Sequence, residues 1–154
     1  MEERKLETSY IYFKDINELS EADRELVLSA SNALQMSYSP YSHFAVGAAV
    51  RLDNDEIILG ANQENAAYPS GLCAERVALF ASGMHKAKPL SIAIVAKSDK
   101  GQFATAYPCG ACRQVMSEIE KRYATHLATI VGLKDGGFVK FENISSLLPF
   151  EFEI

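Results

Sequence analysis

The alternation of apolar and polar residues first predicts a short strand and then a helix. Residues 9–14 (SYIYFK) alternate in the manner of a half-buried strand. A helical pattern follows, and Ser20 with Asp23 three residues later is typical of a helix N-cap with an acidic first turn. Its apolar positions are Leu26, Val27, Ala30, Ala33 and Leu34. The helix should stop before residues 39–42 (SPYS).

The middle of the chain predicts a β-hairpin followed by a second helix. Residues 44–52 and 56–64 are apolar runs on either side of the turn-forming residues 53–55 (DND). A helix should then run from about residue 73 to residue 82, and Gly83 is a suitable residue to end it.

The second half of the chain predicts strands that alternate with a helix. Residues 91–96 form an apolar strand, and a helix should open near residue 108 and continue to about residue 123. Residues 127–133 and 138–141 read as strands, and a short helix lies near residues 145–148. We therefore expect about five strands and three main helices, forming a mixed sheet with helices on both faces.

Composition and charge narrow the class of protein. The 154 residues are 48% hydrophobic and 23% charged, which suits one folded domain with a real core. The net charge of −5 and the scattered lysines and arginines argue against nucleic-acid binding. No segment resembles a signal peptide or a membrane span. We expect a cytoplasmic protein without a membrane partner, in which thiols stay reduced.

The chain has three cysteines, Cys73, Cys109 and Cys112, and each lies at or near a predicted helix N-terminus. Backbone N–H groups and the helix dipole stabilise thiolates there, so three thiolates from two helices are able to converge. Three protein ligands are typical of a catalytic zinc, which keeps a fourth position for water. A structural role and a redox pair formed by the CxxC sequence remain open alternatives.

Glu75, two residues after Cys73, lies where a carboxylate reaches a water on the metal without ligating the metal. A first-turn glutamate that only complements the helix dipole is the alternative. The three histidines, His43, His85 and His126, are scattered and are not at ligand spacing from the cysteines.

Four stretches together resemble a known family. They are CAE (73–75), PCGAC (108–112), NQENAAYPSGLCAER (62–76) and SPYSHFAVGAA (39–49). Zinc deaminases share the pattern of Cys or His, any residue, Glu, followed by Pro-Cys-x-x-Cys. The chain most closely resembles the small homotetrameric zinc-dependent cytidine deaminases over roughly residues 20–152.

The resemblance implies a three-layer α/β/α fold around a five-stranded mixed sheet. It also implies one Zn²⁺ per chain, bound by Cys73, Cys109 and Cys112, with Glu75 carrying protons. Arg76 would donate hydrogen bonds to the thiolate sulfurs and offset their charge.

Further residues are implied to bind the nucleoside. Asn62 and Glu64 would bind the sugar 3′-hydroxyl, Phe44 would pack beside the pyrimidine, and the Ala74 N–H would meet the carbonyl oxygen of the base. Three aromatic residues resemble those that complete or close a site: Tyr41 and Tyr68 in that of a neighbouring subunit, and Phe152 as a cover over the pocket.

The family activity implied for this chain is the hydrolytic deamination of cytidine and deoxycytidine to uridine and deoxyuridine in pyrimidine salvage. A blasticidin-S type aminonucleoside deaminase is the alternative. The resemblance further implies a homotetramer with shared active sites. Residues 20–154 should form the deaminase domain, and residues 1–19 an extension packed on it.

Overall fold

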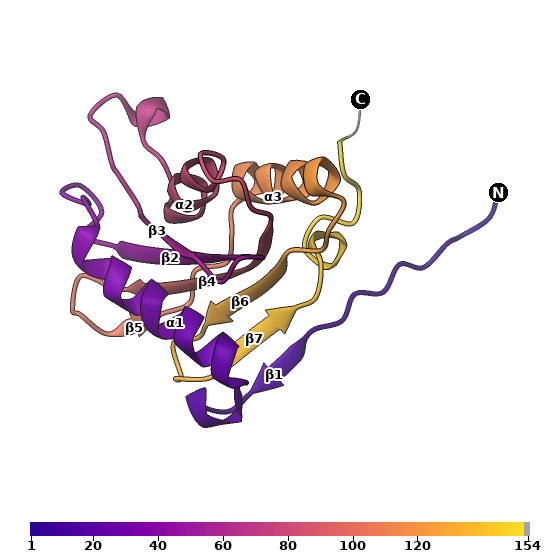
Figure 1. Cartoon of the computed structure of the whole chain (residues 1–154), viewed down its shortest axis with the longest axis horizontal. Coiled ribbons are helices and arrows are strands. Elements are labelled where there is room, and N and C mark those ends of the chain that lie inside the picture. The colour runs from indigo at the N-terminus through magenta and orange to yellow at the C-terminus, as the bar shows by residue number, and fades with distance from the viewer. Residues whose placement is uncertain (153–154) are drawn as a thin grey trace.

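The predicted hairpin is present, in a computed structural model that describes residues 1–152 (Figure 1). Strand β2 (Ala45–Leu52) pairs antiparallel with β3 (Ile57–Ala61). Asp55, in the turn between them, has a φ of 66°, a conformation that Asp adopts more readily than most residues. Residues 153–154, which the predicted domain of 20–154 includes, lie outside the described residues.

Apart from a two-residue strand at Phe103–Ala104, the remaining strands and main helices follow the order predicted from the sequence. The other strands are β1 (Ile11–Phe13), β4 (Pro89–Lys97), β5 (Phe103–Ala104), β6 (Ala128–Gly132) and β7 (Phe138–Phe141). The helices are α1 (Glu21–Ala33), α2 (Ala74–Ser82) and α3 (Gly110–Tyr123). Short 3₁₀ turns occupy Ile16–Glu18, Leu34–Met36, Tyr68–Ser70 and Ile144–Ser146. The last of these replaces the short helix expected near residues 145–148.

All the strands join one mixed sheet in the order β1-β7-β6-β4-β2-β3, with β5 pairing with the end of β4. Strands β4 and β6 are parallel, and the other pairs are antiparallel. The sheet therefore has seven strands, and the expectation of five was wrong. The N-terminal segment contributes β1 by pairing with the edge strand β7. Strand β5 has only two residues, too few to produce a readable period in the sequence.

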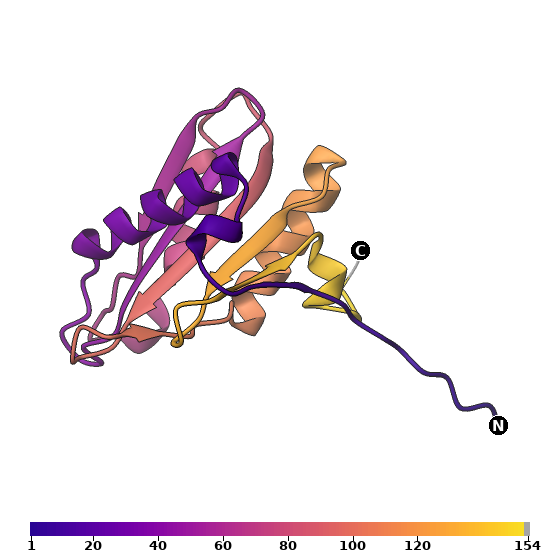
Figure 2. The same cartoon turned by 90° about the horizontal axis from the view of Figure 1, so that it is seen from below.

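Helices cover both faces of the sheet, as expected. Helix α1 lies on one face, and α2 and α3 lie side by side on the other (Figures 1 and 2). Alternate residues of β2 separate the two cores: Val50 packs in the core beneath α2 and α3, whereas Ala49 packs beneath α1. Strand β4 repeats this with Ile94 and Val95, so its continuous apolar run reflects burial on both faces.

The N-terminus of α1 is capped by a side chain, whereas those of α2 and α3, on the other face of the sheet, are not. The Ser20 hydroxyl accepts a hydrogen bond from the Asp23 N–H at 3.1 Å and caps α1, as the sequence predicted. Cys73 and Cys109 occupy the N-cap positions of α2 and α3, and neither side chain makes a capping hydrogen bond. Their sulfurs are therefore free for another role. No helix of the described residues is long and apolar enough to cross a membrane.

Gly47 of β2 lies where the backbone of α1 closely approaches the sheet. A Cβ atom at this position would lie 2.1 Å from the Ala30 carbonyl oxygen of α1. We expect Gly47→Ala to lower the free energy of unfolding by about 3 kcal/mol, because the backbone of α1 must move. Gly132→Ala in β6 is the control, since its Cβ would meet nothing closer than 3.6 Å. Urea denaturation measures both, and equal losses would contradict the close approach at Gly47.

Candidate active site

The three cysteine sulfurs come together where α2 and α3 begin. The Sγ atoms of Cys73 and Cys109 are 3.8 Å apart, and those of Cys109 and Cys112 are 3.5 Å apart. All three ligand atoms lie within 4.8 Å of one another. Sulfurs bound 2.3 Å from a tetrahedral zinc lie about 3.8 Å apart, so this group fits a zinc ion.

The electrostatics of the sulfurs also favour a cation. A hydrogen bond with Cys112 is the main cause that lowers the pKa of Cys73, to about 5, and the neighbouring Arg76 contributes. The same hydrogen bond and burial raise the pKa of Cys112. Without a cation the two sulfurs therefore share one proton, whereas a divalent cation allows every sulfur to be a thiolate.

Arg76 faces this thiolate group from the first turn of α2. Its Nη2 atom donates to the Cys73 sulfur at 3.7 Å. Arg113, the other arginine near the cysteines, points elsewhere: its guanidinium donates to the carbonyl oxygens of Pro108 at 2.8 Å and Leu147 at 2.7 Å. Arg76 is therefore the arginine placed to offset thiolate charge, and Arg113 instead ties the start of α3 to the C-terminal segment.

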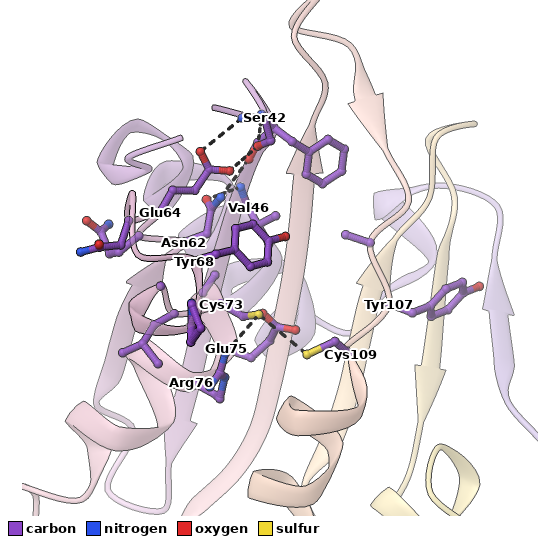
Figure 3. Close-up of a pocket in the computed structure, with 18 residues that line it drawn as sticks. Ser42, Val46, Asn62, Glu64, Tyr68, Cys73, Glu75, Arg76, Tyr107 and Cys109 are labelled. Carbon is purple, nitrogen blue, oxygen red and sulfur yellow. Dashed lines mark hydrogen bonds between the residues drawn. The ribbon is translucent and has the colours of Figure 1, made fainter. Parts of the chain in front are cut away.

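Glu75 is a buried carboxylate beside the sulfurs. Only 4% of the residue is exposed, and Figure 3 places its carboxylate next to the sulfurs of Cys73 and Cys109. Burial is the main cause that raises the pKa of Glu75, and the negative charge of Cys73 raises it further. A carboxyl group with a raised pKa is suited to accept a proton and return it near neutral pH.

A pocket of about 590 Å³ opens above the sulfurs and Glu75. Cys73, Glu75 and Cys109 lie at its floor, and Tyr68 lies above Cys73 (Figure 3). Asn62 and Glu64 lie at the end of the pocket that is farthest from the sulfurs (Figure 3). The pocket is large enough for a nucleoside-sized ligand. Its other lining residues are Ser42, Phe44, Val46, Gln63, Asn65, Pro69, Gly71, Leu72, Ala74, Arg76, Ala106 and Tyr107.

Comparison with known proteins identifies this arrangement. The family described as "Cytidine and deoxycytidylate deaminase zinc-binding region" matches residues 20–126. The chain belongs to this family. Zinc is accordingly its cofactor, and the three-cysteine group is the cluster in the described residues that fits the ion.

Individual members of the deaminase family are similar over most of their length. A cytidine deaminase of Halalkalibacterium halodurans is 43% identical over 136 residues, which cover 84% of this chain and 94% of that protein. The crystal structure of a cytidine deaminase from Burkholderia pseudomallei matches with a TM-score of 0.73 and 33% identity, covering 87% of this chain and all of that one. The Mycobacterium tuberculosis cytidine deaminase matches with a TM-score of 0.62, 30% identity and coverage of 84% and 96%.

Asn62 and Glu64, the residues predicted to bind sugar, hold the rim of the pocket. The Asn62 Nδ2 atom donates to the Phe44 carbonyl at 2.9 Å, and its Oδ1 accepts from the Val46 N–H at 2.8 Å. The Glu64 carboxylate accepts hydrogen bonds from the Ser42 hydroxyl and from the Tyr41 N–H. These bonds lower the pKa of Glu64, and Ser42 is the main cause. Within residues 1–152 the second N–H of the Asn62 amide makes no hydrogen bond and remains available to a ligand.

Two predicted aromatic residues lie outside the pocket of this chain. Phe44, Ala74 and Tyr68 line it, but Tyr41 and Phe152 do not. Phe152 is 68% exposed, and its carbonyl oxygen accepts a hydrogen bond from Gln114 of α3 at 3.3 Å. Phe152 therefore does not close over the pocket within a single chain.

Sequence reasoning missed two groups of pocket residues. Ser42 lies in the stretch 39–49 and is given no role by the sequence, although its hydroxyl donates a hydrogen bond to Glu64. Ala106 and Tyr107 were not considered, although they directly precede Pro108 and Cys109. Their adjacency to a metal-ligand motif was the signal that pointed to them.

We expect the purified chain to hold about one zinc per chain and Cys112→Ser to lose most of it, because two thiolates cannot complete the site. Glu75→Gln is the control from the same cluster, and it should keep its zinc because Glu75 is not among the three sulfur ligands. Metal analysis after gel filtration measures both variants. Full zinc in Cys112→Ser would show that the ion binds elsewhere.

Proposed function

We propose that this chain is a zinc-dependent cytidine deaminase that converts cytidine and deoxycytidine to uridine and deoxyuridine with release of ammonia. The observation that carries the proposal is the buried carboxylate of Glu75 beside three converging sulfurs, at the floor of a nucleoside-sized pocket. The relatives reported above are named cytidine deaminases, so they lend no support to the blasticidin-S alternative.

In this proposal Cys73, Cys109 and Cys112 hold the zinc ion. The Sγ distances of 3.5 and 3.8 Å support this ligand set. Bound there, zinc supplies Lewis acidity, which makes water a competent nucleophile at neutral pH. Cys73 and Cys109 border the pocket, whereas Cys112 is fully buried, so the open side of the group faces the ligand.

Glu75 is the proton carrier of the proposed reaction. Its carboxylate takes a proton from the attacking water and delivers it to N3 of the pyrimidine, while the water oxygen bonds to C4. It then takes the remaining hydroxyl proton and gives it to the amino group, and the C4–N bond breaks to release ammonia. One group acts as base and as acid, which the raised pKa of Glu75 supports.

The remaining pocket residues orient the nucleoside. Ala74 follows Cys73, and its backbone N–H at the start of α2 is proposed to donate to the carbonyl oxygen of the base. Phe44 would pack on the ring. The free N–H of Asn62 and the carboxylate of Glu64 would hold the 3′-hydroxyl. Arg76 would keep the thiolate group from carrying an uncompensated negative charge.

The charges of the pocket favour a nucleoside over a nucleotide. Glu64 stands at the sugar end with a lowered pKa and so remains ionised at neutral pH. Among the described lining residues the cationic side chain is Arg76, which faces the Cys73 sulfur on the pocket floor. A phosphate on the sugar would therefore meet a carboxylate without a compensating cation.

We also propose a homotetramer in the cytoplasm. Tyr41 and Tyr68 are both more than half exposed, which suits residues that help to complete a neighbouring subunit's site. The reducing conditions of the cytoplasm would keep the three cysteines available as thiolate ligands. Residues 20–154 would form the deaminase domain, and the part of the 1–19 extension from Thr8 onward would pack on it. Sedimentation of the zinc-loaded protein tests the assembly, and a monomer would refute it.

The decisive experiment for the proposed activity follows the loss of the cytidine absorbance band on incubation with the zinc-loaded chain. We expect turnover of cytidine and deoxycytidine, with uridine and ammonia as products. Glu75→Gln should lower kcat by about 10²–10⁴-fold while keeping zinc, because a proton carrier is removed. Near-normal turnover in this variant would remove Glu75 from the mechanism, and no deamination by the unaltered chain would refute the function.

A second variant tests the sugar contact. We expect Glu64→Gln to lower kcat/KM for cytidine by about tenfold or more, because a charged acceptor is lost. The lowered pKa of Glu64 predicts the same loss throughout about pH 6 to pH 8, since the carboxylate stays ionised above its pKa. Glu56→Gln is the control, because Glu56 pairs with His85 outside the pocket. Equal kinetics in both variants would contradict the sugar contact.

A further inference from the structure

The first residues of the chain lie outside the part that the deaminase family matches, which begins at residue 20. They nevertheless join the sheet, since β1 pairs with β7 from Ile11↔Lys140 to Phe13↔Phe138. The Thr8 hydroxyl donates to the Ser146 carbonyl at 2.8 Å. Before that point the segment runs away from the body of the molecule (Figures 1 and 2).

Tyr10, directly before β1, connects this segment to β7 through its ring. It lies one residue beyond the Ile11↔Lys140 pair, so it meets Phe141 on the same face of the sheet. The two ring centroids are 5.8 Å apart and the planes are tilted by 48°. Phe141 is only 7% exposed, so burial restricts the movement of the ring against which Tyr10 packs.

Tyr107 packs on the same Phe141. Their ring centroids are 6.4 Å apart at an angle of 74°, an edge-to-face contact. Within residues 1–152 Tyr107 makes no hydrogen bond, so its ring is oriented by packing, to which the edge-to-face contact with Phe141 contributes. Tyr107 borders the pocket and stands two residues before the proposed ligand Cys109. In Figure 3 it lies on the Cys109 side of the pocket, with its ring turned away from the sulfurs.

We propose that Tyr10 is a positioning residue of the active site. Through Phe141 it holds the ring of Tyr107 in place, and with it the wall of the pocket that precedes the metal ligand Cys109. The inference rests on the proposed function, because the ligand whose fit it controls is the nucleoside. The segment before residue 20 is then a working part of this deaminase pocket as well as an added edge strand.

The test compares Tyr10→Ala with Tyr12→Ala and Tyr10→Phe. Tyr12 lies two residues further along, within β1, with similar exposure, 52% against 60%, but its ring rests against Gly137. We expect Tyr10→Ala to raise KM for cytidine and the Kd of uridine, measured by calorimetry, by about three- to tenfold, with kcat changed less than about twofold. Zinc content should not change. Tyr10→Phe should restore both constants, because the contact needs the ring and no hydroxyl partner.

A double-mutant cycle separates positioning from general destabilisation. In a Tyr107→Ala background, Tyr10→Ala should have no further effect on uridine binding, since the wall that it supports is already absent. Additive effects, or equal changes in Tyr10→Ala and Tyr12→Ala, would overturn the inference. So would failure of Tyr10→Phe to restore binding. If the unaltered chain neither binds uridine nor deaminates cytidine, the proposed function fails instead, and the two failures are distinguishable.

Discussion

The meeting of two helix N-termini on one face of the sheet is the constraint on which the site depends. Helices α2 and α3 contact each other and begin at Cys73 and Cys109. Each start presents unpaired N–H groups and the positive end of a helix dipole to sulfur. Neither helix alone supplies three sulfurs, because Cys73 belongs to α2 and the CxxC pair belongs to α3. The packing of α2 against α3 therefore brings three separate thiols into one group that fits a metal ion.

Close backbone contact sets how deeply α2 lies against the sheet. A Cβ atom on Gly60 of β3 would fall 2.4 Å from the Ala74 carbonyl oxygen in the first turn of α2. Only glycine allows this approach, and Ala74 directly follows Cys73. The first turn of α2 is thereby pressed on β3, which buries Glu75 and leaves Cys73 at the pocket floor. The same burial produces the raised pKa of Glu75.

At the polar end of the pocket, Asn62 and Glu64 stabilise the surrounding backbone and still have hydrogen-bonding capacity for a ligand. Asn62 bonds the backbone on both sides of Ala45, and Glu64 bonds the loop at Tyr41 and Ser42. These contacts order the rim before any ligand arrives, which reduces the entropy lost on binding. An amide has spare donor capacity and a carboxylate has spare lone pairs, so both are able to support the rim and still bind a sugar hydroxyl.

The sequence alone determined most of the secondary structure of this protein, through patterns that extend over a few residues. The apolar periods, the Ser20 cap and the turn at residues 53–55 act over a few residues, so the three helices and the main hairpin were predictable. The motifs around Cys73 and Cys109 indicated the candidate zinc ligands, because only a few residue types can bind zinc.

Tertiary structure alone decided the seven-strand count, since pairing of β1 with β7 joins residues about 125 positions apart. It also decided that Arg113 donates to the carbonyl oxygens of Pro108 and Leu147, that Phe152 lies away from its own pocket, and that Tyr10 and Tyr107 share Phe141. Such outcomes depend on side-chain direction and long-range packing, which no local period in a sequence encodes.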